Sequence, residues 1–250
     1  MFFWAFGYFT GMLTSLLQQV RTGWGLLEHL FYPRLCLACQ RRQAPGQANI
    51  CVACRYRLPV TNFHTVVDNP MAERLWGRLP FEQAAAYLYF DRGGQVQQLI
   101  HQLKYRNRPD IGEELGRLYG QVLAQADSWQ RPDLIIPVPL HPRKLHQRGY
   151  NQAAAFGRGL AEALGLRQME HALRRTTYAN SQTRKTRLER MANVTDAFAL
   201  AASPAELSGK HLLLVDDVFT TGATLEACAL PLLAVEGVRI SMATIAIATQ

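Results

Sequence analysis

Apolar residues follow two alternating patterns from about residue 81 to the end of the chain. Unbroken apolar runs of about four to eight residues predict buried strands, and apolar residues at intervals of three and four predict helices. Strands that read as continuous apolar runs are typical of parallel sheets with both faces covered. We therefore expect an α/β fold, with strands at 84–90, 133–138, 197–200, 211–215 and 238–247 and helices at 96–103, 113–126, 152–164 and 224–233.

The chain before residue 81 divides into three parts. Residues 1–23 are an apolar extension in which the first charged side chain is Arg21. A helix packed in the core or on a surface, an over-extended start and a membrane anchor are the open interpretations of this extension. Residues 24–60 hold four cysteines and predict a small domain, residues 61–80 contain proline and asparagine and predict a linker, and residues 81–250 form the main domain.

The apolar extension lacks the Lys or Arg that stands before the apolar run of a secretory signal. Glycine, threonine, serine and glutamine interrupt the run, and the rest of the chain has no apolar stretch of the length that a bilayer span requires. We therefore expect a cytoplasmic protein with no transmembrane segment.

The composition changes the picture mainly through charge. The chain has 250 residues, 48% of them hydrophobic and 18% charged, which suits one sizeable core with a small second domain and excludes disordered, collagen-like and disulfide-dense classes. The net charge is +8, and residues 141–190 alone hold eleven Lys or Arg against three Asp or Glu. A local basic field of this kind indicates an anionic partner, so that phosphates, nucleic acid and acidic lipid all remain open.

Four of the five cysteines form two C-x-x-C pairs separated by eleven residues, and these four are Cys36, Cys39, Cys51 and Cys54. Two such knuckles supply four thiolates, which suits tetrahedral Zn²⁺. Two disulfides or a redox C-x-x-C are the alternatives, and both fit poorly with a doubled motif in a chain that lacks an export signal. Since four cysteines leave no open coordination position, we expect a structural zinc ion. Cys228 lies in an apolar stretch and is expected in the core.

The strongest chemical signal lies where the apolar run 211–215 ends. Two adjacent carboxylates, Asp216 and Asp217, follow this run, and a loop rich in threonine and glycine then opens a helix. Backbone N–H groups at a helix start favour anions, and Gly222 lets the backbone approach one closely. Carboxylates for hydroxyl groups and a loop for a phosphate together fit a sugar phosphate.

Two other nucleotide-binding patterns are absent from the sequence. The strand with two acidic residues could belong to a P-loop ATPase, but the chain has no G-x-x-x-x-G-K-[ST] motif. A Rossmann site would need G-x-G-x-x-G, and the one G-x-G, at Gly157–Gly159, has Glu162 in place of the third glycine.

The segment 215–224, VDDVFTTGAT, resembles the phosphoribosyl pyrophosphate (PRPP) motif of type I phosphoribosyltransferases. The wider chain, from about residue 24 to residue 248, resembles the ComF family, which takes its name from competence, the uptake and use of DNA. The stretches that carry this resemblance are Tyr32–Cys54, Leu103–Tyr105, Ile136–Lys144, Gln147–Ala153 and the PRPP motif. The resemblance implies a type I phosphoribosyltransferase fold, a parallel twisted sheet flanked by helices, with a small N-terminal zinc-binding domain.

The resemblance also implies roles for individual residues. Asp216 and Asp217 would bind the ribose hydroxyls of PRPP with Mg²⁺ nearby, and the 5′-phosphate would lie on Thr220, Thr221, Gly222, Ala223 and Thr224. The leaving pyrophosphate would contact the basic residues after the strand at 133–138, which are Arg143, Lys144 and Arg148. A mobile loop would close over the site with Gln182, Arg184, Lys185, Arg187 and Arg190, although a solvated basic surface would give the same sequence.

The expected function is that of a Mg²⁺-dependent phosphoribosyltransferase that displaces pyrophosphate at ribose C1. The sequence does not name the acceptor. Thr220 stands where some purine-salvage relatives carry a carboxylate, which argues against purine salvage. The alternative is a non-catalytic PRPP-binding or DNA-uptake accessory module, with single-stranded DNA or competence proteins as partners. Few aromatic residues accompany the basic segment 141–190, whereas stacking on single strands would favour more. A homodimer is one option for the oligomeric state.

Overall fold

The computed structural model describes residues 35–44, 49–176 and 197–248. The chain forms two compact units, Met1–Arg55 and Tyr56–Gln250. The smaller unit contains the four paired cysteines, and the larger unit contains the main sheet. Each unit is described by itself below.

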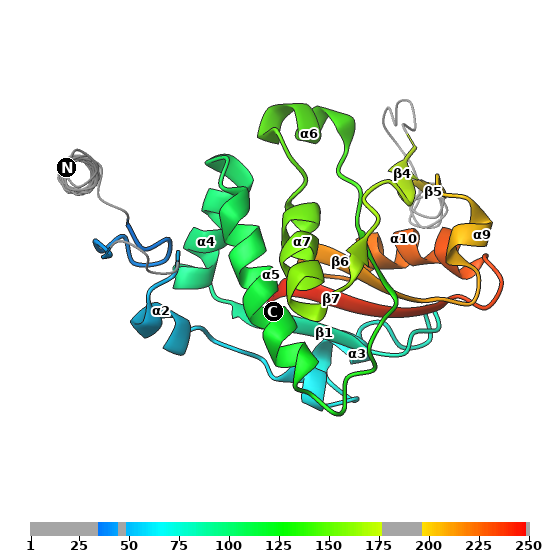
Figure 1. Cartoon of the computed structure of the whole chain (residues 1–250), viewed down its shortest axis with the longest axis horizontal. Helices are drawn as coiled ribbons and strands as arrows, with labels where there is room; N and C mark the ends of the chain where they lie inside the picture. Colours follow the sequence, from blue (N-terminus) through cyan, green and yellow to red (C-terminus); the bar gives the residue numbers. More distant parts are fainter. Residues whose placement is uncertain (1–34, 45–48, 177–196, 249–250) are drawn as a thin grey trace, which may run out of the picture. The chain divides into compact units, whose positions relative to one another are not determined.

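The centre of the larger unit is a sheet of five strands in the order β1-β7-β6-β2-β3, and every neighbouring pair is parallel (Figure 1). The middle strand, β6, is buried along the apolar run that precedes the acidic pair. The expected α/β class with a parallel sheet flanked by helices is therefore confirmed. The strands are β1 Ala84–Phe90, β2 Leu134–Pro137, β3 Arg167–Gln168, β6 His211–Phe219 and β7 Arg239–Ala248.

The connections between these strands change direction within the sheet. From β1 the chain passes through α4 and α5 to β2 and then through α7 to β3, moving toward one edge, whereas α10 leads from β6 back to β7. Because such crossovers are right-handed, α10 covers the face opposite to α5 and α7. The direction reverses between β2 and β6, so their carboxyl ends flank the switch point at which open α/β sheets bind ligands. The helices are α4 Gln95–Tyr105, α5 Pro109–Ala124, α7 Gln152–Leu164 and α10 Ala223–Leu233.

Helices α5 and α7 lie against each other at unusually short range, and glycines make this possible (Figure 1). A Cβ atom on Gly116 would fall well inside van der Waals contact with the Phe156 carbonyl, and one on Gly159 would meet the Glu113 carbonyl in the same way. The two glycines thus let the backbones approach until they touch. This close pair of helices covers the strands beside the switch point.

The segment that the sequence suggested as a linker, residues 61–80, belongs to the larger unit and is packed. It forms a short 3-10 helix, η1 Phe63–Thr65, and a helix α3 Pro70–Glu73, and it buries Met71 and Leu75 completely. Asn69 caps α3 and donates a hydrogen bond to the Ala84 carbonyl at the start of β1 (2.9 Å). The linker interpretation is therefore wrong for this segment, because proline and asparagine here begin a helix instead of loosening the chain.

The predicted strand at 197–200 is present as β5 Phe198–Leu200, but it lies outside the main sheet. It pairs antiparallel with β4 Leu173–Arg175 in a separate two-stranded sheet. Besides η1 and α3, the described residues form three further short helices that were not predicted, namely α2 Val52–Tyr56, α6 Pro142–Arg148 and α9 Pro204–Leu207. Among the described residues, no helix has the length and apolar character needed to cross a membrane.

We predict that Gly116→Ala lowers the free energy of unfolding by about 2 kcal/mol or more, since the added methyl group must push α7 away from α5. Chemical denaturation of the full chain measures the change. Gly94→Ala is the matched control, because its added methyl group would meet Asp91 atoms at 3.3 Å or more. Equal effects of the two substitutions would contradict the close helix contact.

Candidate functional site

The candidate site lies at the carboxyl ends of β6 and β2. Near the end of β6 the buried apolar run gives way to Asp216 and Asp217, which are partly exposed. The Val138 N–H donates to the Val215 carbonyl (2.9 Å), so the chain leaving β2 stays hydrogen-bonded to β6 immediately before the acidic pair. The fold thus brings the two segments that carry the predicted chemistry to the same edge of the sheet.

The two carboxylates are in different environments. The Asp217 N–H donates to Asp216 Oδ1 (2.8 Å), and the Lys104 ammonium lies 3.1 Å from Asp217 Oδ2. Burial, and then the neighbouring charge of Asp217, raises the pKa of Asp216 to about 7, while Lys104 and Arg175 act in the opposite direction. The pair therefore changes its charge near neutral pH, and one added cation or hydrogen-bond donor favours the doubly ionised form.

The loop after β6 leads directly into α10. Gly222 is the N-cap of this helix with φ +80°, a conformation that favours glycine, and Leu75 and Phe219 lie so close that a side chain has no room there. Thr220, Thr221 and Thr224 are exposed around it, and the Thr221 hydroxyl accepts a long hydrogen bond from the Ala223 N–H (3.5 Å). Exposed hydroxyls and N–H groups at the start of an eleven-residue helix suit an anion.

Two arginines donate hydrogen bonds to the carbonyl oxygens of this loop. Arg74 donates to the Thr220 carbonyl (3.0 Å), and Arg78 donates to the Thr221 carbonyl (2.6 Å) and pairs with Glu226 of α10. They fix the loop at its carbonyl oxygens, and Arg74 places positive charge beside it, whereas the charge of Arg78 is offset by Glu226. Sequence reasoning missed both residues because they follow α3 in the supposed linker. The sequence signal that could have identified them is that the two arginines are four residues apart and shortly follow Pro70.

The predicted pyrophosphate residues lie on α6, which begins just beyond β2. His141 caps this helix by accepting a hydrogen bond from the Arg143 N–H, and the side chains of Arg143 and Lys144 are exposed. Arg148 lies over the Tyr105 ring at 5.6 Å and donates to Gln152 Oε1 (2.8 Å). Within the described residues, no ion pair links these three basic residues of α6 to the acidic pair.

Two sets of predicted residues lie outside the described residues. One is the mobile-loop set, Gln182, Arg184, Lys185, Arg187 and Arg190, and the other is the apolar extension, residues 1–23. The strands on either side of the mobile-loop segment, β4 and β5, are described, and Arg175 of β4 influences the pKa of Asp216.

The four cysteine sulfurs of the smaller unit lie within 4.8 Å of one another, and those of Cys39 and Cys51 are 4.0 Å apart. That separation is about twice the length of a disulfide bond and close to the spacing of sulfurs around a tetrahedral metal ion. Burial acts to raise the pKa of Cys36, but the N–H groups of Cys51, Cys39 and Ala38 outweigh it and lower the pKa to about 6. The cluster could therefore hold a metal ion, and all five cysteines are free thiols.

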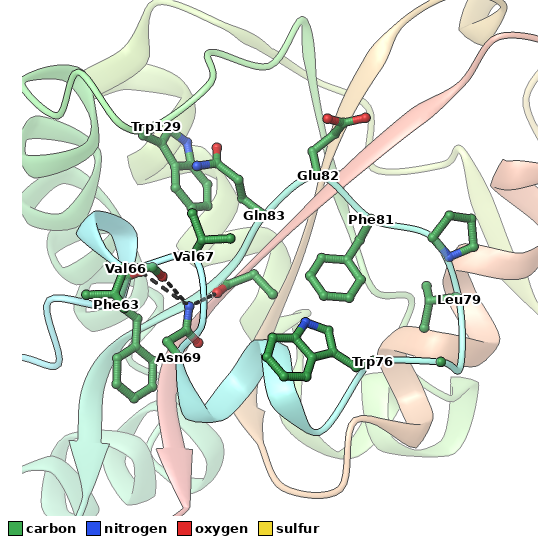
Figure 2. A pocket seen from close by; sticks show the side chains of 13 residues that line it. Phe63, Val66, Val67, Asn69, Trp76, Leu79, Phe81, Glu82, Gln83 and Trp129 are labelled. Atoms are coloured by element: carbon green, nitrogen blue, oxygen red, sulfur yellow. Dashed lines mark hydrogen bonds between the residues drawn. The ribbon is translucent and has the colours of Figure 1, made fainter.

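A separate pocket of about 280 Å³ opens beside the start of β1 (Figure 2). Four aromatic residues, Phe63, Trp76, Phe81 and Trp129, are part of its lining, and Trp76 and Phe81 lie next to each other in Figure 2. Because β1 is parallel to β6, this pocket is at the amino ends of the strands, away from the carboxyl ends that hold the acidic pair. None of the predicted site residues lines it.

Comparison with known proteins gives several relatives, although no family model matches the chain. DNA utilization protein YhgH of Escherichia coli O6:H1 is 31% identical over 210 residues, which cover 78% of this chain and 88% of that protein. Competence protein F of Haemophilus influenzae is 34% identical over 130 residues, or 51% of this chain and 57% of that protein. Competence protein ComFC of Bacillus subtilis is 27% identical over 202 residues, or 78% and 76%.

Solved structures with partial similarity include the glutamine PRPP amidotransferase from B. subtilis complexed with ADP and GMP. It is 20% identical with a TM-score of 0.38, and the match covers 57% of this chain and 30% of that chain. A structure described as the allosteric regulatory enzyme of purine biosynthesis has a TM-score of 0.37 over 57% of this chain and 29% of that chain. This chain thus spans about a third of the length of these two enzymes.

We predict that Asp216→Asn stabilises the ligand-free chain at pH 8 but has little effect at pH 4. The pKa of Asp216 is raised to about 7 in the folded state from an ordinary value of 3.8, so the folded chain binds the proton more tightly and loses stability as the pH rises between these values. Asparagine removes that loss while keeping an oxygen for the Asp217 N–H. The gain at pH 8 is on the order of 1–2 kcal/mol, or a few degrees in Tm.

Thermal unfolding at both pH values measures this difference. Asp217→Asn is the comparison: it removes the repulsion that helps to raise the pKa of Asp216 but also removes the partner of Lys104, so its gain at pH 8 should be smaller than that of Asp216→Asn. An equal change in Tm at pH 4 and pH 8 for Asp216→Asn would contradict the assignment of the buried charge.

Proposed function

Since the chain belongs to the ComF family, with DNA utilization protein YhgH and competence proteins F and ComFC among its relatives, we propose that it is a Mg²⁺-dependent phosphoribosyltransferase of the pentosyl class. It binds PRPP and displaces pyrophosphate at ribose C1. One observation carries the proposal, namely that a buried strand presents Asp216 and Asp217 at the switch point and continues into an anion-favouring loop. A sugar with vicinal hydroxyls and a phosphate matches both features.

In the proposed complex the acidic pair accepts hydrogen bonds from the ribose hydroxyls. Ionised Asp216 is a stronger acceptor and has more acceptor sites than its protonated form, so with the pKa of Asp216 raised to about 7 we expect binding to strengthen as the pH rises through neutrality. Carboxylate oxygens are the ligands that Mg²⁺ prefers, so the same pair fits this ion. When bound, Mg²⁺ would supply positive charge to the pyrophosphate oxygens.

The loop 220–224 receives the 5′-phosphate. Its hydroxyls and N–H groups, the start of α10 and the cation of Arg74 favour negative charge at this place. With the phosphate at one end and the hydroxyls at the acidic pair, ribose C1 is oriented for displacement. Positioning of this kind supplies a large part of the barrier reduction in group transfer.

The leaving pyrophosphate is assigned to the basic residues after β2, namely Arg143, Lys144 and Arg148. This assignment is supported by the hydrogen bond from the Val138 N–H to the Val215 carbonyl, which joins the segment after β2 to β6. Cations beside the departing group stabilise the charge that develops as the bond to C1 breaks. The mobile-loop residues remain a prediction, in which they exclude water that would compete with the acceptor.

The cysteine cluster is proposed to hold one structural Zn²⁺. The support is the sulfur spacing, because zinc binds four thiolates at such distances and they close its coordination sphere. Free thiols of this kind fit a reducing compartment, in line with a cytoplasmic protein.

The second candidate function is a non-catalytic PRPP-binding or DNA-uptake accessory module. The names of the relatives, which refer to DNA utilization and competence, favour it. Single-stranded DNA is its candidate partner. The arginines that flank the cysteines, Arg41, Arg42, Arg55 and Arg57, are the candidate phosphate contacts. Such binding depends steeply on salt.

We predict that the purified chain binds PRPP in the presence of Mg²⁺ and releases pyrophosphate with one member of a broad acceptor panel. Radiolabelled PRPP measures both steps. Asp217→Asn should weaken PRPP binding at least tenfold, because it removes an ionised acceptor for a ribose hydroxyl. Lys210→Gln, at the opposite end of β6, should leave binding unchanged.

Four outcomes of these experiments decide between the candidates. Pyrophosphate release that disappears in Asp217→Asn supports the enzyme. Tight PRPP binding without release across the panel favours the accessory module, and so does salt-dependent binding to single-stranded DNA. Failure to bind PRPP at pH 8 with Mg²⁺ would overturn the proposed function.

We predict that the chain contains one Zn²⁺ and that Cys36→Ser loses it, because serine is a poor replacement for a thiolate ligand. Metal analysis of the purified protein gives the ratio of zinc to protein. Cys228→Ser, which changes a buried cysteine outside the cluster, is the control and should retain the ion. Zinc retained at full stoichiometry in Cys36→Ser would contradict the assignment.

A further inference from the structure

Among the described residues, Lys104 is the basic residue that forms an ion pair with a member of the acidic pair, Asp217. It lies in the last turn of α4, and its ammonium is 3.1 Å from Asp217 Oδ2. The two side chains are 22% and 16% exposed, so this ion pair is largely shielded from solvent. None of the roles derived above uses this lysine.

The end of α4 is also tied to the segment that follows β2. The Tyr150 hydroxyl donates a hydrogen bond to the Leu103 carbonyl, and burial raises the pKa of Tyr150 to about 12, so that this donor keeps its proton at neutral pH. Arg148 lies over the ring of Tyr105. Leu103 and Tyr105, the chain neighbours of Lys104, thus contact the segment after β2. Lys104 itself forms its ion pair with Asp217.

Lys104 thus contacts Asp217, which would bind a ribose hydroxyl, and its chain neighbours contact the segment after β2, which would bind the pyrophosphate. In PRPP the pyrophosphate is attached to C1, next to the carbon that carries the first of the ring hydroxyls. A cation in contact with the carboxylate that binds those hydroxyls is therefore within reach of the pyrophosphate. An ammonium has three donors, so it can keep one carboxylate contact while it binds a phosphate oxygen.

We propose, on the basis of the proposed function, that Lys104 is a further PRPP ligand that contacts the pyrophosphate. In the free chain its ammonium neutralises Asp217. In the complex Asp217 accepts a hydrogen bond from a ribose hydroxyl, and the ammonium keeps its contact with Asp217 while it also binds the pyrophosphate oxygens. The same side chain thus keeps the empty site from excess negative charge and receives the leaving group.

A purely structural ion pair and a pyrophosphate ligand have different consequences. Loss of a structural pair would disturb Asp217 and weaken every ligand that binds the acidic pair. Loss of a pyrophosphate ligand weakens only ligands that carry pyrophosphate. Ribose 5-phosphate, which has the hydroxyls and the 5′-phosphate but no pyrophosphate, separates the two cases.

The test is calorimetric titration of the full chain with Mg²⁺ and PRPP, with Mg²⁺ and inorganic pyrophosphate, and with ribose 5-phosphate. In Lys104→Gln the Kd for PRPP and for pyrophosphate should rise about 10-fold to 100-fold, as expected for a lost charge-assisted contact, and the Kd for ribose 5-phosphate should rise by a factor several times smaller, since it reports only the altered charge of the acidic pair. Lys104→Arg should recover part of the pyrophosphate affinity. Lys210→Gln is the matched control, and a single cooperative thermal transition shows that each variant is folded.

The contrary results are distinct. An equal loss of affinity for PRPP and ribose 5-phosphate, or no loss for either, would overturn the role of Lys104 while PRPP binding by the unmodified chain preserves the proposed function. If the unmodified chain binds none of the three ligands, both proposals are overturned.

Discussion

The candidate site depends on placing two carboxylates near the carboxyl end of the middle strand of the sheet. β6 is the middle strand of the sheet, and its apolar residues pack on both faces until the chain reaches Asp216. Burial makes the charge of Asp216 unfavourable, and Asp217 beside it adds repulsion. A fold that keeps such a pair must compensate with nearby cations, and here Lys104 and Arg175 supply them. An unfavourable arrangement of this kind is typical of a functional site.

Much of the remaining architecture supports the loop that follows the pair. Gly222 permits a sharp entry into α10, Leu75 packs beneath it, and Arg74 and Arg78 hold the loop's carbonyl oxygens. These contacts come from a segment that is distant in sequence, so the loop conformation is set by tertiary structure. The close contact of α5 and α7 covers the strands on the other side of the switch point. The candidate site therefore rests on rigid elements, which suits a mechanism based on positioning.

Sequence reasoning predicted the parts of the fold with strong local signals. The apolar runs of β2 and β6 and the helix α7 lie where their periodicity indicated. The interpretation of residues 61–80 failed because Asn69 and Pro70 were taken as loop residues, whereas in the structure they begin a helix that packs against β1. The separate pairing of β5 with β4 was also missed, since strands of three residues carry no information about their partners.

The acidic pair, the threonine and glycine loop and the cysteine cluster were all identified from local motifs. Lys104, Arg74 and Arg78 were not given roles, because their importance comes from contacts across more than a hundred residues of chain. No pattern in one sequence reports such contacts. For the same reason the sequence could suggest what the site binds but not how its empty form is neutralised.

The most direct test of the central claim is a crystal structure of the chain soaked with PRPP and Mg²⁺. The account predicts electron density for a ribose whose hydroxyls contact Asp216 and Asp217 and whose 5′-phosphate lies on residues 220–224. A sugar bound elsewhere, or a loop whose own side chains fill the phosphate position at saturating ligand, would contradict it.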